Sequence, residues 1–224
     1  MRHIYCYLLL LLNTFLFAQQ TNFVDFKKAK ADLFIYPAES KISGTIKYHF
    51  DILKAVDSIY INGRNLSCKS ALLNGKEIPI YTKMDKLWIF NDFRLSKNNV
   101  LTISYEGNPK KAMYFIGWDN SAPNQVWTQG QGKYTSNWLP SFDDVNEKIE
   151  FDLNIEAEKT YQVIANGKLS DFERLDNSEY NVWHYDMKKP MSSYLLALVI
   201  GKYDKKIYYY KSGLTIEMYY YTKD

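Results

Sequence analysis

The sequence contains few of the residues that build disulfides and metal centres. Among its 224 residues are only 2 cysteines and 3 histidines, and Cys6 and His3 lie in an apolar leader. Cys68, His49 and His184 remain, without the paired spacing of zinc ligands. A single thiol cannot form an internal disulfide. We therefore expect a metal-free chain stabilised by burial, with His49 facing outward from a strand, His184 contacting a neighbouring strand and Cys68 as a small buried side chain.

Signals for nucleotide and nucleic-acid binding are also missing. Gly132-Lys133 is not a phosphate-binding loop, because Trp127 stands where the first glycine of that motif is required. The Gly-x-Ser-x-Gly turn of serine hydrolases is absent. The formal charge is only +3, and it comes from scattered lysines and four arginines. Nucleic-acid proteins concentrate such charge on one face, so the sequence argues against a nucleic-acid partner.

Residues 1–18 have the pattern of a secretory signal peptide. Arg2 supplies a positive start, an apolar run follows, and Ala18 provides a small residue before Gln19. The run is shorter than the roughly 20 apolar residues that span a bilayer. The sequence predicts an exported protein, periplasmic or extracellular, with no membrane span and one domain over residues 19–224.

The remaining sequence is typical of an all-β fold. Aromatic residues make up 17% of the chain, and apolar residues alternate with polar ones along 42–52, 59–61 and 101–105. Asn62-Gly63, Asn74-Gly75 and Asn166-Gly167 lie between apolar runs and favour tight turns. We expect a large curved antiparallel sheet or β-sandwich. The one segment with a helix-like spacing of apolar residues is Phe26–Leu33.

A long stretch from residue 107 to 137 has no alternation. It is rich in aromatic residues, which argues against disorder and predicts an ordered loop held by its rings: Tyr114, Phe115, Trp118, Trp127, Tyr134 and Trp138. Strands are expected to resume over 147–155, 161–165, 182–185 and 194–200, and again over 214–221.

Two sets of polar residues in and after this loop could act on a ligand. Asp143, Asp144 and Glu147 could supply a glycosidase carboxylate pair, but adjacent residues of a strand point to opposite faces, which favours a turn or salt bridge. Gln129 and Gln131 are two residues apart, so in an extended segment they would point the same way. Their amides offer donors and acceptors to the end of a peptide.

The segments Thr128–Asp144 and Pro190–Leu198 together resemble the signature of the aminopeptidase N-like zinc metallopeptidases, the gluzincins. The resemblance implies the saddle-like N-terminal β domain of these enzymes, with the catalytic zinc domain expected after residue 224. It also implies that Gln129 and Gln131 bind the α-amino group and first residue of a peptide. Met191–Leu198 would form a buried edge near the next domain, where the serine pair allows close backbone approach.

The sequence departs from this family at two places. Gln131 stands where many members have a carboxylate, so it can hydrogen-bond an ammonium group but cannot form an ion pair with it. Thr135-Ser136 replaces an Ala-Arg pair, which removes a cation to which we assign a structural role.

Two hypotheses follow from these observations. In the first, the chain is the substrate-recognition domain of an exported zinc aminopeptidase, inactive by itself, whose partners are peptide N-termini and the catalytic domain. In the second, it is a free-standing exported β-sandwich module that binds peptides or glycans through an exposed aromatic loop bearing Trp118, Trp127, Tyr134 and Trp138.

Overall fold

The structure is a computed structural model that describes residues 19–221, so the leader predicted for residues 1–18 lies outside the described residues. This part of the chain is built from strands and four single-turn 3₁₀ helices, η1 (Gln20–Asn22), η2 (Pro37–Glu39), η3 (Thr135–Asn137) and η4 (Ser193–Leu195). The strands are β1 (Val24–Tyr36), β2 (Lys41–Ile52), β3 (Val56–Asn62), β4 (Leu66–Leu73), β5 (Lys76–Glu77), β6 (Tyr81–Lys83), β7 (Lys86–Phe93), β8 (Ser96–Gly107), β9 (Met113–Ile116), β10 (Gln125–Thr128), β11 (Lys148–Glu158), β12 (Gln162–Ala165), β13 (Lys168–Arg174), β14 (Tyr180–Ser192), β15 (Leu198–Gly201), β16 (Asp204–Tyr209) and β17 (Thr215–Tyr220). The all-β prediction is confirmed.

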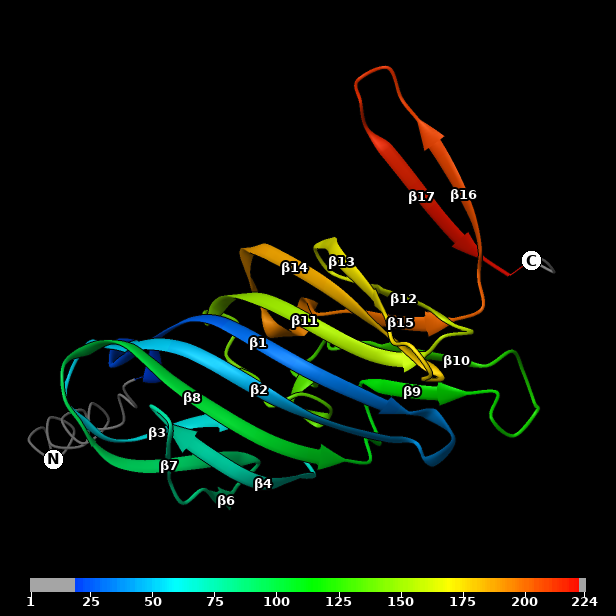
Figure 1. Ribbon diagram of the computed structural model, residues 1–224. Coiled ribbons are helices and arrows are strands. Elements are labelled where there is room, and N and C mark those ends of the chain that lie inside the picture. The colour runs from blue at the N-terminus through cyan, green and yellow to red at the C-terminus, as the bar shows by residue number, and fades with distance from the viewer. Residues whose placement is uncertain (1–18, 222–224) are drawn as a thin grey trace, which may run out of the picture.

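A large curved sheet of eight strands forms the front of the molecule in Figure 1, in the order β13-β14-β11-β1-β2-β8-β4-β5. Neighbouring strands are antiparallel except β1 and β11, which run parallel. Two smaller sheets complete the body: β12-β15-β10-β9 and β3-β7-β6. Apolar residues from all three sheets belong to one buried cluster, so the body has a single core.

Strand β1 explains why its sequence has a helix-like spacing. A β-bulge between Phe26 and Lys28 shifts the pairing with β2 by one residue. The inward-facing positions therefore change from Val24 and Phe26 to Ala29, Ala31 and the odd-numbered positions after them. The apolar spacing across the bulge resembles that of a helix, but Phe26–Leu33 is part of a strand.

The three Asn-Gly pairs have different roles in the fold. Asn74-Gly75 closes the β4–β5 hairpin with both residues at positive φ. Asn62-Gly63 and Asn166-Gly167 instead lie where the chain passes from one sheet to another. An Asn-Gly pair marks a reversal of the chain, but which strands pair across it depends on where their apolar faces are buried.

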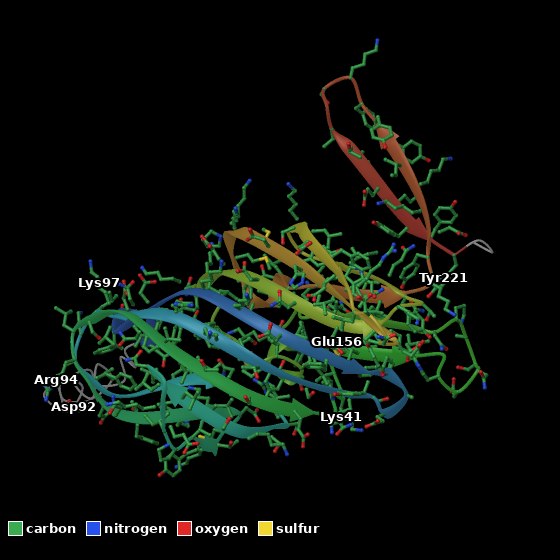
Figure 2. The ribbon with its side chains drawn as sticks, in the orientation of Figure 1. Lys41, Asp92, Arg94, Lys97, Glu156 and Tyr221 are labelled. Carbon is green, nitrogen blue, oxygen red and sulfur yellow. The ribbon has the colours of Figure 1, made fainter. Side chains whose placement is uncertain are left out.

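The last two strands, β16 and β17, form a hairpin that projects away from the three sheets (Figure 1). They pair only with each other, and their side chains extend into solvent on both faces (Figure 2). Large apolar residues are among those exposed, including Ile207, Ile216 and Met218. In residues 19–221, no helix has the length and apolar character needed to cross a bilayer.

Candidate functional site

The segment Thr128–Asp144 leaves strand β10 and passes into the interior of the molecule. After a turn at residues 131–134 and the helix η3, Trp138 and Leu139 are fully buried. Phe142 packs against the rings of Phe26 and Tyr48, with centroids 4.6 and 5.4 Å away. The Tyr48 hydroxyl donates a hydrogen bond to the Pro140 carbonyl. The loop is thus anchored on the central strands β1 and β2.

The second segment singled out in the sequence, Pro190–Leu198, lies directly against the first. Thr135 Oγ1 donates a hydrogen bond to the Ser193 carbonyl at 2.9 Å. Ser193 Oγ accepts one from the Phe142 amide at 3.2 Å. Thr128 Oγ1 accepts one from the Leu198 amide at 2.8 Å. The two segments, 50 residues apart in sequence, therefore form one structural unit.

Gly130 is the point of closest approach between these segments. A Cβ atom at this position would lie 2.2 Å from Thr135 Oγ1 and 2.7 Å from the Tyr194 carbonyl oxygen, far inside van der Waals contact. The backbone of the loop can therefore lie against Tyr194 only because residue 130 has no side chain.

Gln129 and Gln131 flank this buried glycine, and both are exposed. The Gln129 amide donates to the Ala112 carbonyl at 2.9 Å, which ties the loop to the start of β9. Within residues 19–221, neither glutamine side chain has a hydrogen-bond partner. Because β10 ends at Thr128, the two residues lie beyond the strand, and the alternation argument for their common direction does not apply. Their amides are free to bind a ligand at a backbone position that is rigidly held.

Arg64, for which no role was predicted from the sequence, holds this loop in place through ion pairs and hydrogen bonds. Its Nη2 lies 2.8 Å from Asp143 Oδ2 and its Nη1 lies 2.8 Å from Asp85 Oδ2. Its Nε donates to Ser136 Oγ at 3.2 Å, and Ser136 Oγ donates to Asp143 Oδ1 at 3.0 Å. The hydrogen bond to Asp143 and the two carboxylates raise the pKa of Arg64, which keeps it charged.

The backbone near Arg64 joins the same contact. The Arg64 amide donates to the Ser136 carbonyl at 2.7 Å, and Asn62 and Ser141 exchange two backbone hydrogen bonds. Asn62 Oδ1 accepts a further bond from the Asp143 amide at 3.0 Å. Arg64 thus supplies, from a turn about 70 residues upstream, a cation next to Ser136. Ser136 stands where the resemblance implies an arginine, so Arg64 replaces the charge that the substitution removes. Only the folded chain brings these positions together, so no local sequence signal could have identified Arg64.

Of the three carboxylates considered as an acid-base pair, Asp143 lies in an ion pair and Glu147 is buried near Asp144. Asp143 is engaged by Arg64 and Ser136. Glu147 is 5% exposed, and its pKa is raised to about 8 by burial and then by the nearby carboxylates of Asp25 and Asp144. Asp143 therefore belongs to a structural ion pair, as the turn or salt-bridge interpretation predicted.

The aromatic residues of the loop mostly stabilise it. Trp138 is fully buried, and Trp127 stacks on Tyr114 with centroids 4.5 Å apart. Trp118 packs against Tyr161 at 6.1 Å, and Tyr134 is 39% exposed. The rings order this stretch as predicted, but the loop prediction was wrong for Met113–Ile116 and Gln125–Thr128, which form the paired strands β9 and β10. The prediction that Trp138 is exposed for ligand binding was wrong, because its ring fills the core.

The residues that could ligate a metal lie apart. His49 is exposed on β2, as expected, and His184 Nδ1 lies 2.7 Å from Asn154 Oδ1 on the neighbouring strand β11. Cys68 is a free thiol and only half-buried, which differs from the buried position that we expected. In the described part of the chain, no group of three or more His, Cys, Asp or Glu residues could hold a metal ion. These residues do not fit a zinc site.

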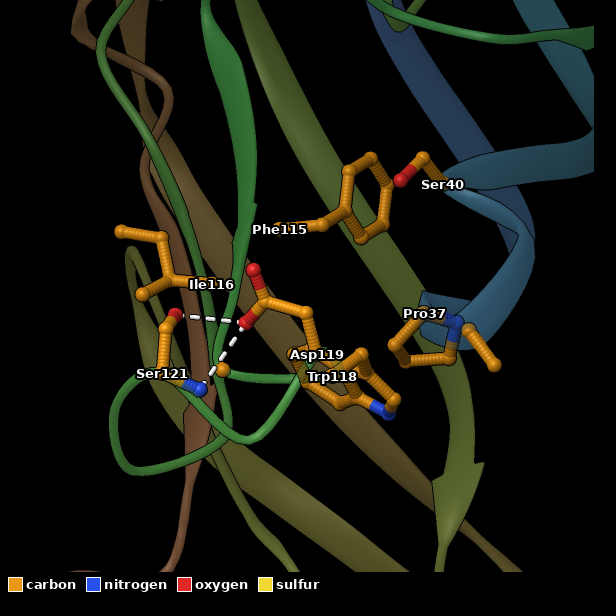
Figure 3. A pocket seen from close by; sticks show the side chains of 9 residues that line it. Pro37, Ser40, Phe115, Ile116, Trp118, Asp119 and Ser121 are labelled. Atoms are coloured by element: carbon orange, nitrogen blue, oxygen red, sulfur yellow. Dashed lines mark hydrogen bonds between the residues drawn. The ribbon is translucent and has the colours of Figure 1, made fainter.

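A cavity of about 480 Å³ lies between the β1–β2 turn and the loop after β9 (Figure 3). Phe115, Trp118 and Pro37 line it, and Asp119 accepts hydrogen bonds from the amide and hydroxyl of Ser121. These bonds hold the pKa of Asp119 below its usual value. Neither Gln129 nor Gln131 lines this cavity. The Asp119 carboxylate already accepts hydrogen bonds within its own loop, so we assign the cavity no chemistry.

Known proteins with similar sequences are aminopeptidases. A probable aminopeptidase 1 of Sulfurisphaera tokodaii is 25% identical over 153 residues, which cover 66% of this chain and 18% of that protein. A leucyl aminopeptidase of Saccharolobus solfataricus is 26% identical over 157 residues, 66% of this chain and 19% of that protein. The chain thus spans about a fifth of the length of these relatives.

The solved structures with a similar fold are larger than this chain as well. The M1 zinc metallopeptidase of Deinococcus radiodurans superposes with a TM-score of 0.74 at 14% identity, covering 88% of this chain and 46% of that one. A mutant of it bound to a Tyr-Ser-Ala substrate gives a TM-score of 0.72 at 15% identity, covering 87% and 46%. The family model described as the peptidase M1 N-terminal domain matches residues 27–195. The chain belongs to the M1 peptidase family, as its N-terminal domain.

Proposed function

We propose that this chain is the substrate-recognition domain of an exported zinc-dependent aminopeptidase that removes N-terminal amino acids from peptides. The observation that carries the proposal is the pair of exposed, unpartnered amides of Gln129 and Gln131 on either side of the buried Gly130. A ligand-binding group must be accessible and yet held in position, and this loop provides both properties. Export rests on the leader pattern of residues 1–18 alone.

In this proposal the two glutamine side chains bind the α-amino end of the peptide. A protonated amine donates hydrogen bonds, and each amide carbonyl can accept one. Zinc and the group that activates water belong to the rest of a longer protein, since the described residues do not fit a zinc site. The chain by itself therefore positions a peptide and leaves it intact.

The proposal is tested by titrating the purified chain with Tyr-Ser-Ala and with the same peptide acetylated at its amine, followed by amide NMR shifts. Acetylation removes the charged donor, so we expect the acetylated peptide to bind more weakly. Gln129→Ala with Gln131→Ala should abolish this difference while leaving the thermal unfolding midpoint unchanged, because both side chains are exposed. Equal binding of the two peptides by the unaltered chain would contradict the proposal.

A gain of affinity provides a sharper prediction at the same position. Gln131→Glu places a carboxylate opposite the amine, and a charge-assisted hydrogen bond is about twice as strong as a neutral one. The variant should bind the free-amine peptide several-fold more tightly than the unaltered chain and the acetylated peptide no more tightly. The same change at exposed Gln19, outside the loop, is the matched control and should alter neither affinity.

The size of the native protein tests the part of the proposal that concerns a catalytic domain. An antibody against residues 19–224 should detect, in the producing cells and their medium, a species several times longer than this chain. A native species of about 200 residues would instead favour the free-standing binding module.

A further inference from the structure

A second, smaller cavity lies between the turn at Arg64 and the part of the loop around Tyr134. Its volume is about 200 Å³, below the range of roughly 300–1,000 Å³ that is usual for whole small molecules. It can therefore admit one side chain or terminal group. The residues that line it are Arg64, Asn65, Asp85, Lys110, Lys111, Tyr134 and Asn137.

The lining of this cavity is cationic. Arg64 and Asp85 form an ion pair at 2.8 Å, so the one carboxylate of the lining is already engaged. Lys110 and Lys111 are both exposed, and neither has a carboxylate partner within residues 19–221. Lys111 Nζ lies 5.4 Å from the centre of the Tyr134 ring, which holds the ammonium group on the cavity wall. Two lysine charges are thus available to an anion.

Backbone hydrogen bonds link the wall of the cavity to the segment that carries the glutamine pair. Lys111 precedes Ala112, whose carbonyl accepts the hydrogen bond from the Gln129 amide. Tyr134 donates its own amide to the Gly130 carbonyl at 3.0 Å. Lys111 and Tyr134 of the cavity wall are thus tied to the backbone that carries the glutamines, and three residues of an extended peptide, at about 3.3–3.6 Å each, span about 10 Å. A peptide with its amine at the glutamines can therefore reach the lysines within its first three residues.

We propose that this cavity binds a carboxylate of the peptide whose amine is held by Gln129 and Gln131. The carboxylate is either an acidic side chain within the first three residues or the C-terminus of a short peptide. The inference rests on the proposed function, and it narrows the substrates to peptides with negative charge near their N-terminus. Lys110 and Lys111 would act as specificity-determining residues, because a neutral peptide gains nothing from them.

The test compares Tyr-Ser-Ala, its C-terminal amide, and the amide of Tyr-Glu-Ala, each titrated at millimolar concentration into the full chain and followed by NMR. The C-terminal amide has no carboxylate and should bind about tenfold more weakly than the free acid, the loss of one charge-assisted interaction. Recovery of affinity by Tyr-Glu-Ala amide would identify the acidic side chain as a second source of the carboxylate. If only the free acid binds tightly, the C-terminus is the group recognised.

Variants separate this cavity from general charge attraction. Lys110→Ala with Lys111→Ala should make the acid and its amide bind equally, whereas Lys110→Arg with Lys111→Arg should retain the preference. Lys97→Ala, at an exposed lysine of β8 labelled in Figure 2, is the matched control and should change nothing. Equal binding of acid and amide by the unaltered chain, or no shift at Lys110, Lys111 and Tyr134, would overturn the proposal.

Failure here can be distinguished from failure of the proposed function. Acetylation of the peptide amine tests the glutamine pair, and amidation of its carboxylate tests the lysine cavity. If the chain prefers free amines but its affinity is insensitive to amidation, the proposed function stands and carboxylate binding in the cavity is refuted. A carboxylate preference that is insensitive to acetylation would support anion binding at the lysines and contradict the role of the glutamines.

Discussion

At the scale of single residues, Glu147 makes the stability of the protein depend on pH. Its carboxyl is buried beside Asp25 and Asp144, and its pKa is raised to about 8, although Lys27 and the amide of Phe26 partly oppose the shift. Below pH 4.5 the group is neutral in the folded and unfolded chains. Between pH 4.5 and 8 only the unfolded chain loses the proton, so the free energy of unfolding falls as pH rises.

Glu147→Gln removes this titration and should stabilise the protein at high pH. We expect the variant to gain about 4 kcal/mol relative to the unaltered chain between pH 5 and pH 9, since only the unfolded chain is deprotonated over about three of these pH units and each corresponds to about 1.4 kcal/mol. Urea unfolding at the two pH values measures the change. Glu77→Gln, at an exposed position of β5, is the control and should show the same stability relative to the unaltered chain at both pH values. A pH-independent effect of Glu147→Gln would refute the raised pKa of Glu147.

Arg64 stabilises the loop through its ion pair with Asp143. Arg64→Ala leaves Asp143, whose side chain is 13% exposed, without its cation, so we expect a loss of about 1–3 kcal/mol in the free energy of unfolding. Arg94→Ala breaks the Arg94–Asp92 pair at the edge of the molecule, where both side chains are more than 70% exposed (Figure 2). That control should cost less than about 0.5 kcal/mol. Equal losses in the two variants would show that the ion pair of Arg64 does not stabilise the loop more than an exposed surface pair does.

At the scale of elements, Gly130 joins the two segments that carry the family resemblance. Gly130→Ala forces Thr135 or Tyr194 to move, so we expect a destabilisation of about 2 kcal/mol or more and weaker peptide binding. Gly75→Ala is the control: its φ is +81°, yet nothing lies within 4 Å of an added Cβ, so it should cost only about 1 kcal/mol of backbone strain. Chemical denaturation of both variants compares the two effects. A smaller loss for Gly130→Ala than for Gly75→Ala would refute the close approach of residue 130 to Thr135 and Tyr194.

Strand β1 illustrates what element-level patterns can and cannot predict. Alternation identified β2, β3 and β8, because each keeps one face in the core over residues 42–52, 59–61 and 101–105 respectively. The bulge after Phe26 breaks the alternation in β1, and the bulge exists because of the pairing with β2. A pattern read within one strand cannot reveal a shift that its neighbour imposes.

At the scale of the whole molecule, the body and the β16–β17 hairpin should behave differently. The three sheets share one buried cluster, whereas the hairpin pairs only with itself and is marginal in isolation. A chain that ends at Tyr203 should still unfold cooperatively in urea, with a free energy of unfolding within about 1 kcal/mol of that of the full chain. It should also associate less at high concentration, because it lacks the exposed Ile207, Ile216 and Met218. Loss of folding on truncation would show that the hairpin belongs to the core.

The sequence by itself determined the β class and the two segments of the family signature, and it nominated the glutamine pair as candidate binding residues. These features depend on local composition and spacing, which survive without knowledge of the partner strands. Only the tertiary structure decided that Arg64 clamps Asp143, that Trp138 fills the core, and that Lys110 and Lys111 line one cavity with Arg64. Each of these facts joins positions that lie tens of residues apart, and their distance in space is set by strand pairing and by burial.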